Sequence, residues 1–233
     1  LLLSAAAHGK ITDLPDGLGE GYGTNGDQIY IWNKMPENPG PRQGGPVIYG
    51  SREWDNPDQL TNTIIQASIP PISPGRSFTS AIPSSLVPGM AGVSEPTVKG
   101  TNATMLVGFG VSPDRGRFQY NPTTRKVELQ WPKDGDAALA ARIHERIATV
   151  AGPESQLINT NKTVNSTWHP LGGACIDVVC DLEGRVKGQK GLYVLDGALM
   201  PGTTSGCNPS MTIAAVVERA LDRIVKNDVG TII

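Results

Sequence analysis

Polar side chains suited to chemistry gather in three short segments near the end of the chain, around His169, Asp196 and Asn208. His169 is followed by Pro170 and soon by two glycines, so we expect a rigid turn that leaves the imidazole little side-chain cover. An imidazole in that setting can accept or donate a proton near neutral pH. Asp196 and Gly197 end an apolar run, and α/β folds present ligand-binding groups at such ends. The three segments form a candidate site for proton transfer and ligand binding.

Asn208 is expected to begin the last helix, with Pro209 at the first helical position, where its missing N–H is not needed. A helix N-terminus carries partial positive charge and free N–H groups, so it can stabilise an anionic ligand. The Asn208 amide can also donate a hydrogen bond to an oxygen atom of a substrate. Two plainer roles stay open at this point: His169 as a loop histidine with satisfied hydrogen bonds, and Asn208 as a helix cap.

The elements around these segments are expected to be short. A strand is predicted over residues 192–195, directly before Asp196, and residues 154–190 are expected to be mostly irregular. The helix after Asn208 is amphipathic, because its apolar residues recur at three- and four-residue spacing. Its apolar face contains Ile213, Val217, Leu221 and Ile224, and its charged face Glu218, Arg219, Asp222 and Arg223.

Upstream, short strands alternate with turns rich in proline and glycine. A three-stranded meander is predicted over residues 104–131, from strands at 104–111, 117–120 and 126–131. Earlier strands are expected at 28–32, 46–49 and 63–69, with a loop over 76–103.

A helix is predicted over residues 134–150, where Asp134 and Asp136 suit the positive N-terminus. His144 on this helix is expected to be solvated. The apolar stripe consists of Leu139, Ile143, Ile147 and Val150.

The composition excludes several function classes. The 233 residues are 38% hydrophobic and 18% charged, with a formal net charge of −2. The chain can therefore bury a core, and it has no basic run that would bind nucleic acid. No apolar stretch reaches the roughly 20 residues of a membrane span. Cys175, Cys180 and Cys207 have neither the even count of a disulfide framework nor zinc-site spacing, so no metal is expected.

The first 26 residues suggest a chain that continues upstream. Residues 1–9 lack an initiator methionine and a basic leader, and they are typical of a helix end closed by Gly9. The compartment is therefore left open. Residues 21–26 match the string G-x-G-x-x-G, but a loop precedes them and a strand-like run follows. The strand–turn–helix context of a dinucleotide-binding fingerprint is missing.

Several motifs together resemble the glucose–methanol–choline (GMC) oxidoreductases. The apolar run with Asp-Gly-x-Leu-x-Pro-Gly at 196–202 and the Asn-Pro-x-x-Thr start of the last helix at 208–212 are characteristic of that family. The His-Pro-Leu-Gly-Gly segment at 169–173, with an aromatic residue before it, resembles the cholesterol-oxidase branch. So do the glycine-rich loop at 19–26 and the Pro-Asp-Arg-Gly-Arg-Phe segment at 113–118.

The resemblance implies a bound FAD and a substrate hydroxyl held between His169 and Asn208. His169 would position the hydroxyl and help remove its proton, while hydride passes to flavin N5. The substrate would be a sterol such as cholesterol or another hydrophobic secondary alcohol, with O2 reduced to H2O2. The flavin-binding residues implied by the match are Asp196, Gly197, Asn208, Pro209, Ser210 and Thr212.

The resemblance also implies an α+β fold: a mixed or antiparallel substrate-binding sheet with helices, and a C-terminal strand–helix that completes a Rossmann-like FAD domain. We assign residues 1–26 to a helix end and the glycine-rich loop. Residues 27–165 form the substrate-binding region, and residues 166–233 complete the FAD domain and the active site. The partner of this chain would be the N-terminal FAD-binding portion, and the chain alone is expected to turn over nothing.

The chain departs from the family pattern at one chemical position. Sterol oxidases that also isomerise the double bond use a carboxylate base in a strand before a proline-rich turn. The matching place is near Gln66 and Ser68, neither of which can act as a carboxylate base. The sequence therefore predicts alcohol oxidation, whereas the missing carboxylate gives no basis for predicting isomerisation.

Two other functions remain as alternatives. One is a GMC dehydrogenase that acts on another bulky alcohol and passes electrons to an acceptor other than oxygen. The other is a non-catalytic binding module that kept the fold. A serine hydrolase is excluded, because the sequence contains no G-x-S-x-G elbow.

Overall fold

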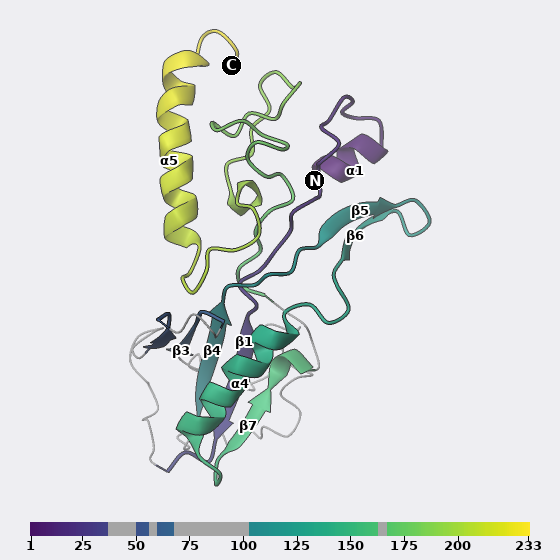
Figure 1. The fold of residues 1–233 in the computed structure, drawn as a ribbon. Helices are drawn as coiled ribbons and strands as arrows, with labels where there is room; N and C mark the ends of the chain where they lie inside the picture. The colour runs from purple at the N-terminus through teal and green to yellow at the C-terminus, as the bar shows by residue number, and fades with distance from the viewer. Residues whose placement is uncertain (37–49, 56–59, 68–102, 163–166) are drawn as a thin grey trace, which may run out of the picture. The chain divides into compact units, whose positions relative to one another are not determined.

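The computed structural model describes residues 1–36, 50–55, 60–67, 103–162 and 167–233. The backbone forms two compact units, which we describe one at a time (Figure 1). Unit 1 comprises residues 1–25, 112–136 and 169–233, and unit 2 comprises residues 26–111 and 137–168. The predicted functional division at 1–26, 27–165 and 166–233 stays a prediction.

Unit 2 is built on a five-stranded sheet with the order β2-β3-β4-β1-β7, in which every neighbouring pair is antiparallel. The sheet agrees with the predicted α+β class, and its strands at 28–32, 63–69 and 104–111 are confirmed within a residue or two over the described positions. The strand at 46–49 and nearly all of the loop at 76–103 lie outside the described residues. The strands are β1 (Gln28–Asn33), β2 (Gly50–Glu53), β3 (Asn62–Ala67), β4 (Thr104–Gly110) and β7 (Gln156–Asn159).

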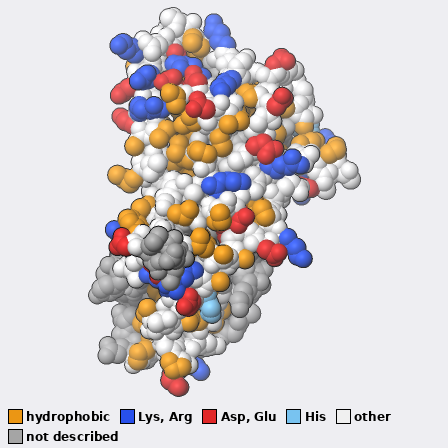
Figure 2. All heavy atoms as spheres, viewed as in Figure 1, with side chains coloured by type: hydrophobic (Ala, Val, Ile, Leu, Met, Phe, Trp, Pro, Cys, Tyr) orange, Lys and Arg blue, Asp and Glu red, His pale blue; other side chains and the backbone are white. Residues whose placement is uncertain are grey.

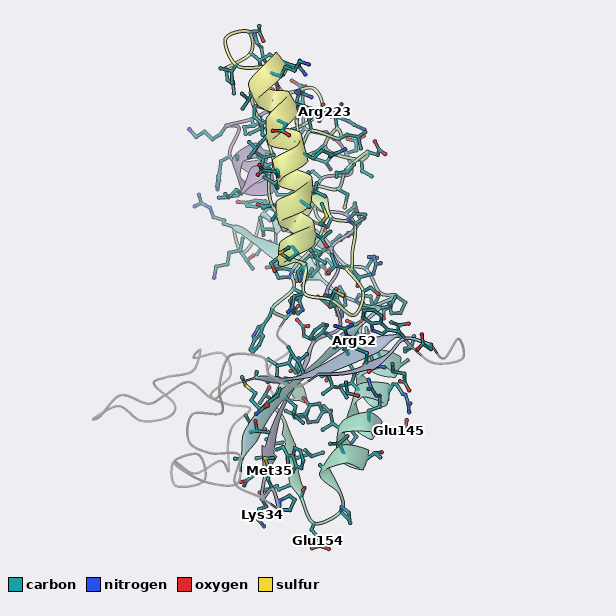
Figure 3. The ribbon with its side chains drawn as sticks, turned by 90° about the vertical axis from the view of Figure 1, so that its left-hand side faces the viewer. Lys34, Met35, Arg52, Glu145, Glu154 and Arg223 are labelled. Carbon is teal, nitrogen blue, oxygen red and sulfur yellow. The ribbon has the colours of Figure 1, made fainter. Side chains whose placement is uncertain are left out.

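Helix α4 (Ala137–Ala151) covers one face of this sheet, as Figure 3 shows from the side, with Glu145 pointing away from the strands. Side chains alternate between the two faces of a strand, so Tyr30 and Leu106 pack under the helix while Ile29 and Val107 pack on the opposite face. The predicted helical stripe is confirmed at its three buried members. They are Leu139, Ile143 and Ile147.

Two expectations for α4 were wrong at its ends. Val150 is 64% exposed, and Ala151 lies on the buried side instead. The helix begins at Ala137 rather than at residue 134, so Asp134 and Asp136 precede its first turn; Asp136 has a φ of 64° and is buried. His144 is exposed as expected, yet its Nδ1 lies 3.1 Å from the Tyr30 hydroxyl oxygen.

The predicted meander over 104–131 does not form. The strand at 104–111 is β4, which pairs with β1 and β3 inside unit 2. The other two strands, β5 (Arg117–Asn121) and β6 (Lys126–Gln130), form a separate hairpin in unit 1. Neighbouring strands in the sequence favour hairpins, but β4 gains two long-range partners in the larger sheet, a choice that local pattern does not encode.

Unit 1 has little regular structure beyond the hairpin. Its helices are α1 (Leu2–Ala7), the short η4 (Gly197–Leu199) and α5 (Ser210–Asn227). Its core contains Leu171, Ala174, Val179, Cys180, Val186, Leu199 and Met200. Hydrophobic side chains also gather on the visible surface of the half that contains α5 (Figure 2). Leu221, a member of the predicted apolar face of α5, is 38% exposed, so part of that face is open.

Residues 154–190 are mostly irregular as expected, and their described part contains β7 and the short η3 (Thr160–Lys162). Two other sequence predictions need correction in the C-terminal region. Residues 192–195 form no strand; Tyr193 makes a single antiparallel bridge with Arg185. Pro209 is the N-cap of α5 rather than its first helical residue. A four-residue apolar run needs strand neighbours to become a strand, and the described residues provide one bridge.

Within the described part of the chain, no helix has the length and apolar character to cross a membrane. No group of three or more His, Cys, Asp or Glu side chains is placed to hold a metal ion there. Cys175 and Cys180 are buried thiols, Cys207 is exposed, and all three are free.

Candidate active site

His169 and Asn208, 39 positions apart, meet in unit 1. His169 Nε2 lies 3.0 Å from Asn208 Oδ1. Because an amide oxygen only accepts, this contact is a hydrogen bond in the tautomer with the proton on Nε2, whose N–H donates to Asn208 Oδ1. His169 is 6% exposed, whereas Asn208 is exposed. The expectation of little side-chain cover around His169 was therefore wrong, because the side chain is buried.

The turn after His169 is held by the glycine-rich loop at 19–26. Leu171 and Gly23 exchange two backbone hydrogen bonds of 3.0 and 2.9 Å. Gly172 has a φ of 79°, and a Cβ there would lie 2.0 Å from the Gly21 carbonyl oxygen. Only glycine fits this approach of two backbones without displacement. The turn after His169 is thus held by backbone hydrogen bonds and close packing against the glycine-rich loop.

Asp196 and Gly197 connect this turn to the start of α5. Asp196 caps η4, because its Oδ1 accepts a 2.7 Å hydrogen bond from Ala198 N. Gly197 O accepts a hydrogen bond from the Gly172 amide. A Cβ on Gly197 would lie 3.0 Å from the Pro170 carbonyl oxygen and 3.2 Å from Ile213 Cδ1. The three segments singled out in the sequence are thus in van der Waals contact.

The N-terminus of α5 is open to a ligand. Pro209 has a helical φ of −75° and offers no side-chain cap. The first hydrogen bond of the helix runs from Ile213 N to Pro209 O. Ser210 and Thr212 lie in the first turn and are exposed. Free first-turn N–H groups and the positive end of the helix dipole suit an anionic group, so this donor set fits the negatively charged edge of a reduced flavin.

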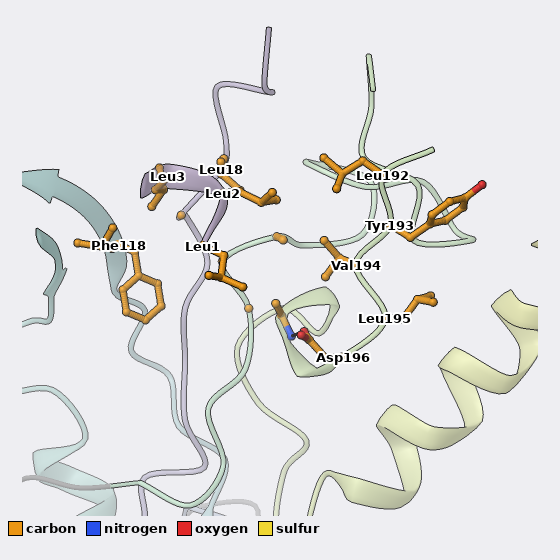
Figure 4. Close-up of a pocket in the computed structure, with 16 residues that line it drawn as sticks. Leu1, Leu2, Leu3, Leu18, Phe118, Leu192, Tyr193, Val194, Leu195 and Asp196 are labelled. Carbon is orange, nitrogen blue, oxygen red and sulfur yellow. Dashed lines mark hydrogen bonds between the residues drawn. The ribbon is translucent and has the colours of Figure 1, made fainter. Parts of the chain in front are cut away.

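A pocket of about 580 Å³ opens beside Asp196 (Figure 4). Its walls are mainly apolar: Leu2 and Leu18 lie across from Val194 and Leu195. Asp196 lies at one edge, with an exposed carboxylate. An apolar cavity with one polar group at its edge is the usual form of a site for a small molecule or cofactor.

Asp136 is a buried carboxylate that the sequence did not indicate. Its oxygens accept hydrogen bonds from Ser112 Oγ and from Thr24 Oγ1, the latter at 3.2 Å. Burial raises the pKa of Asp136 above its ordinary value, although the two hydroxyls lower it in part. At the position where a carboxylate base was sought, Gln66 Nε2 donates to Thr104 Oγ1 at 3.2 Å. The neighbouring Ser68 lies outside the described residues.

Sequence reasoning also missed Asn25, which belongs to the glycine-rich loop. Its side chain is fully buried and bonds the segment that leads to Asn208. The only available signal was its place in a loop of the expected family pattern, because an asparagine among glycines ordinarily indicates a turn.

Comparison with known proteins agrees with these motifs over part of the chain. Residues 117–216 match the family model of the GMC oxidoreductases. A cholesterol oxidase from Acinetobacter baumannii is 43% identical over 63 residues, which is 25% of this chain and 11% of that protein. The GMC match contains His169, Asp196 and Asn208.

Solved structures extend the likeness of fold over nearly the whole chain. Pyridoxine 4-oxidase from Mesorbium loti superposes with a TM-score of 0.57 at 13% identity, covering 93% of this chain and 45% of that one. An FAD-dependent oxidoreductase from Chaetomium thermophilum gives a TM-score of 0.47 at 17% identity, covering 95% of this chain and 51% of that one. The chain thus spans about half the length of these structures.

Proposed function

We propose that this chain is the C-terminal part of an FAD-dependent GMC oxidoreductase that oxidises a secondary alcohol. The observation that carries the proposal is the 3.0 Å contact between His169 Nε2 and Asn208 Oδ1, made at the N-terminus of α5. The GMC match over residues 117–216 supports it, because that region contains both side chains. The contact favours a working pair over an isolated loop histidine and a plain helix cap.

The two side chains can hold an alcohol between them. The substrate hydroxyl would enter the contact, donate its proton to His169 Nε2 and accept a hydrogen bond from Asn208 Nδ2. This requires the histidine tautomer with Nε2 unprotonated and an amide turned to present its nitrogen. Bound FAD would supply the acceptor for the hydride of the carbinol carbon, and O2 would recover the electrons as H2O2.

Residues around the pair would hold the cofactor. The first turn of α5, at Pro209, Ser210 and Thr212, offers positive dipole and N–H groups to the electron-rich edge of a flavin. Gly197 lies close to Ile213 of the same helix, and with the adjacent Asp196 it would contact the ribityl chain. The rest of the FAD site would come from the N-terminal portion of the full-length protein.

A sterol is our proposed substrate class. It is supported by the 63-residue match to a cholesterol oxidase and by the His-Pro-Leu-Gly-Gly segment that resembles that branch. Gln66 stands where the sterol isomerisation base would be, so we propose oxidation of the 3-hydroxyl without isomerisation. A dehydrogenase acting on another bulky alcohol is the competing function.

The test uses the full-length flavoprotein that carries this chain, mixed with cholesterol under air. Flavin absorbance, peroxide and conjugated enone are followed together. Flavin bleaching with peroxide and without enone is the expected result. Bleaching without peroxide would favour the dehydrogenase, and a bound flavin that no bulky alcohol reduces would favour a non-catalytic module.

A matched variant tests the residue assignment in the same assay. His169→Ala should retain bound flavin but lose about 10²-fold or more in the rate of flavin reduction, as for the loss of a positioned general base. Near-normal reduction in that variant would remove His169 from the mechanism.

A further inference from the structure

The side chain of Asn25 is fully buried and engages both of its polar ends. Its Oδ1 accepts hydrogen bonds from Thr203 Oγ1 at 2.9 Å and from Thr204 N at 3.0 Å. Its Nδ2 donates to the Cys207 carbonyl oxygen at 2.9 Å and to Thr204 Oγ1 at 3.2 Å. One amide therefore holds both ends of the segment 203–207, although it lies about 180 positions away in sequence.

The bond to the Cys207 carbonyl matters most for the site. That carbonyl belongs to the peptide group that joins Cys207 to Asn208. Asn25 therefore bonds the backbone immediately before Asn208, whose side-chain amide is proposed to act in catalysis. The segment it holds is tightly folded, because Ser205 adopts a φ of 68° and Thr204 Oγ1 also donates to the Cys207 carbonyl at 3.1 Å. A left-handed residue in such a segment is strained and persists only when its surroundings hold it.

The loop that carries Asn25 also carries the other half of the site. Gly23 exchanges backbone hydrogen bonds with Leu171, two positions after His169. A Cβ on Gly23 would lie 2.1 Å from the Gly202 carbonyl oxygen, so the loop packs equally closely against the segment before Thr203. Backbone bonds at Gly23 thus place the histidine, and side-chain bonds of Asn25 place the asparagine.

We propose that Asn25 is a positioning residue that sets the distance between Asn208 and His169. The proposal rests on the proposed function, because it assigns Asn25 a role in alcohol oxidation through Asn208. The hydrogen bonds of the Asn25 side chain go to the segment 203–207, so Asn25 would act on the reaction only through Asn208. Its part is to keep the segment 203–207 in the conformation that places the Asn208 side chain beside the imidazole, where Oδ1 lies 3.0 Å from Nε2.

The first test is the rate of flavin reduction by alcohol in the full-length flavoprotein. Asn25→Ala should lower this rate by about 10- to 100-fold at saturating alcohol, because a misplacement of about 1 Å can cost about that much. Asn62→Ala is the matched control. Asn62 is also fully buried and donates to a side chain and to a backbone carbonyl, Glu53 Oε2 and Leu60 O. The control should lose thermal stability comparably and keep its rate within about 2-fold.

A double-mutant cycle separates positioning from general damage. If Asn25 acts through Asn208, then Asn25→Ala should cost less than about 3-fold in an Asn208→Ala background, against the full loss in the wild type. Equal losses in both backgrounds would overturn the proposal even if the enzyme is an alcohol oxidase.

A crystal structure of Asn25→Ala gives a readout that does not depend on activity. We expect the contact between His169 Nε2 and Asn208 Oδ1 to open beyond hydrogen-bond distance and the segment 203–207 to move. An unchanged contact in that structure would refute the positioning role. If none of the alcohols tested reduces the flavin of the wild-type protein, the proposed function fails. The crystal structure of Asn25→Ala still decides whether Asn25 sets the geometry of His169 and Asn208.

Discussion

Gly172→Ala should damage the turn that presents His169, and its neighbour Gly173 is the matched control. Both glycines have left-handed φ values, 79° and 96°, which cost an alanine about 1 to 2 kcal/mol. They differ in their surroundings. A Cβ on Gly172 would lie 2.0 Å from the Gly21 carbonyl oxygen, whereas a Cβ on Gly173 would lie 3.5 Å from Phe118 Cδ2, an ordinary contact.

The extra cost at position 172 follows from what must move. Real Cβ atoms essentially never come within 3.0 Å of such an atom, so the two backbones would have to separate. That separation threatens the two hydrogen bonds between Leu171 and Gly23, each worth about 0.5 to 1.5 kcal/mol. We therefore expect Gly172→Ala to lose about 1 to 3 kcal/mol more free energy of unfolding than Gly173→Ala.

Denaturant unfolding of the full-length protein measures both variants, and the midpoint shift at constant slope gives the difference. Flavin reduction should also fall further in Gly172→Ala, because the displaced turn carries His169. Equal losses of unfolding free energy in the two variants would refute the argument, since only the left-handed backbone would then matter.

Three further predictions concern the site and its supports. Asn208→Leu should lower the rate of flavin reduction by about 10²-fold, the scale of one lost donor, and an unchanged rate would leave Asn208 a helix cap. Gly108→Ala should destabilise the protein by about 1 to 3 kcal/mol, because its Cβ would lie 2.2 Å from Ile143 Cγ2 in the core; thermal unfolding tests this. Burial raises the pKa of Asp136, so the folded state holds its proton more tightly and stability should fall as the pH rises from about 4 through the raised value. Asp136→Asn should remove that part of the pH dependence, and an identical pH profile of unfolding would contradict it.

The local sequence pattern was sufficient to predict an element wherever the signal for that element lies within its own residues. The stripe Leu139, Ile143 and Ile147 predicted α4 because the 3.6-residue period places those side chains on one face whatever they pack against. The hairpin β5–β6 was predicted because its turn and its strands are adjacent in sequence. The start of α5 was also predicted within one residue, because Pro209, its N-cap, is itself a local signal for a helix start.

Local pattern failed where pairing is decided by distant segments. The residues of the strand at 104–111 do not indicate that it pairs with β1 and β3 instead of β5. Residues 192–195 are mainly apolar, yet their backbone bonds to Gly184 and Val186 amount to one isolated bridge, and a strand needs a longer ladder than that. Val150 was assigned to the buried stripe by its three-residue spacing from Ile147, but Ala151, four residues after Ile147, takes the buried position in the last turn of α4.

The sequence by itself determined which residues are candidates for chemistry, because residue type and close neighbours decide what His169, Asp196 and Asn208 can do. Only the tertiary structure decided that His169 Nε2 lies 3.0 Å from Asn208 Oδ1. It also decided that Asn25 bonds the backbone carbonyl of Cys207, directly before Asn208. The physical reason is that a buried amide gains its hydrogen bonds from whichever chain segments the fold brings to it, and sequence separation places no constraint on that choice.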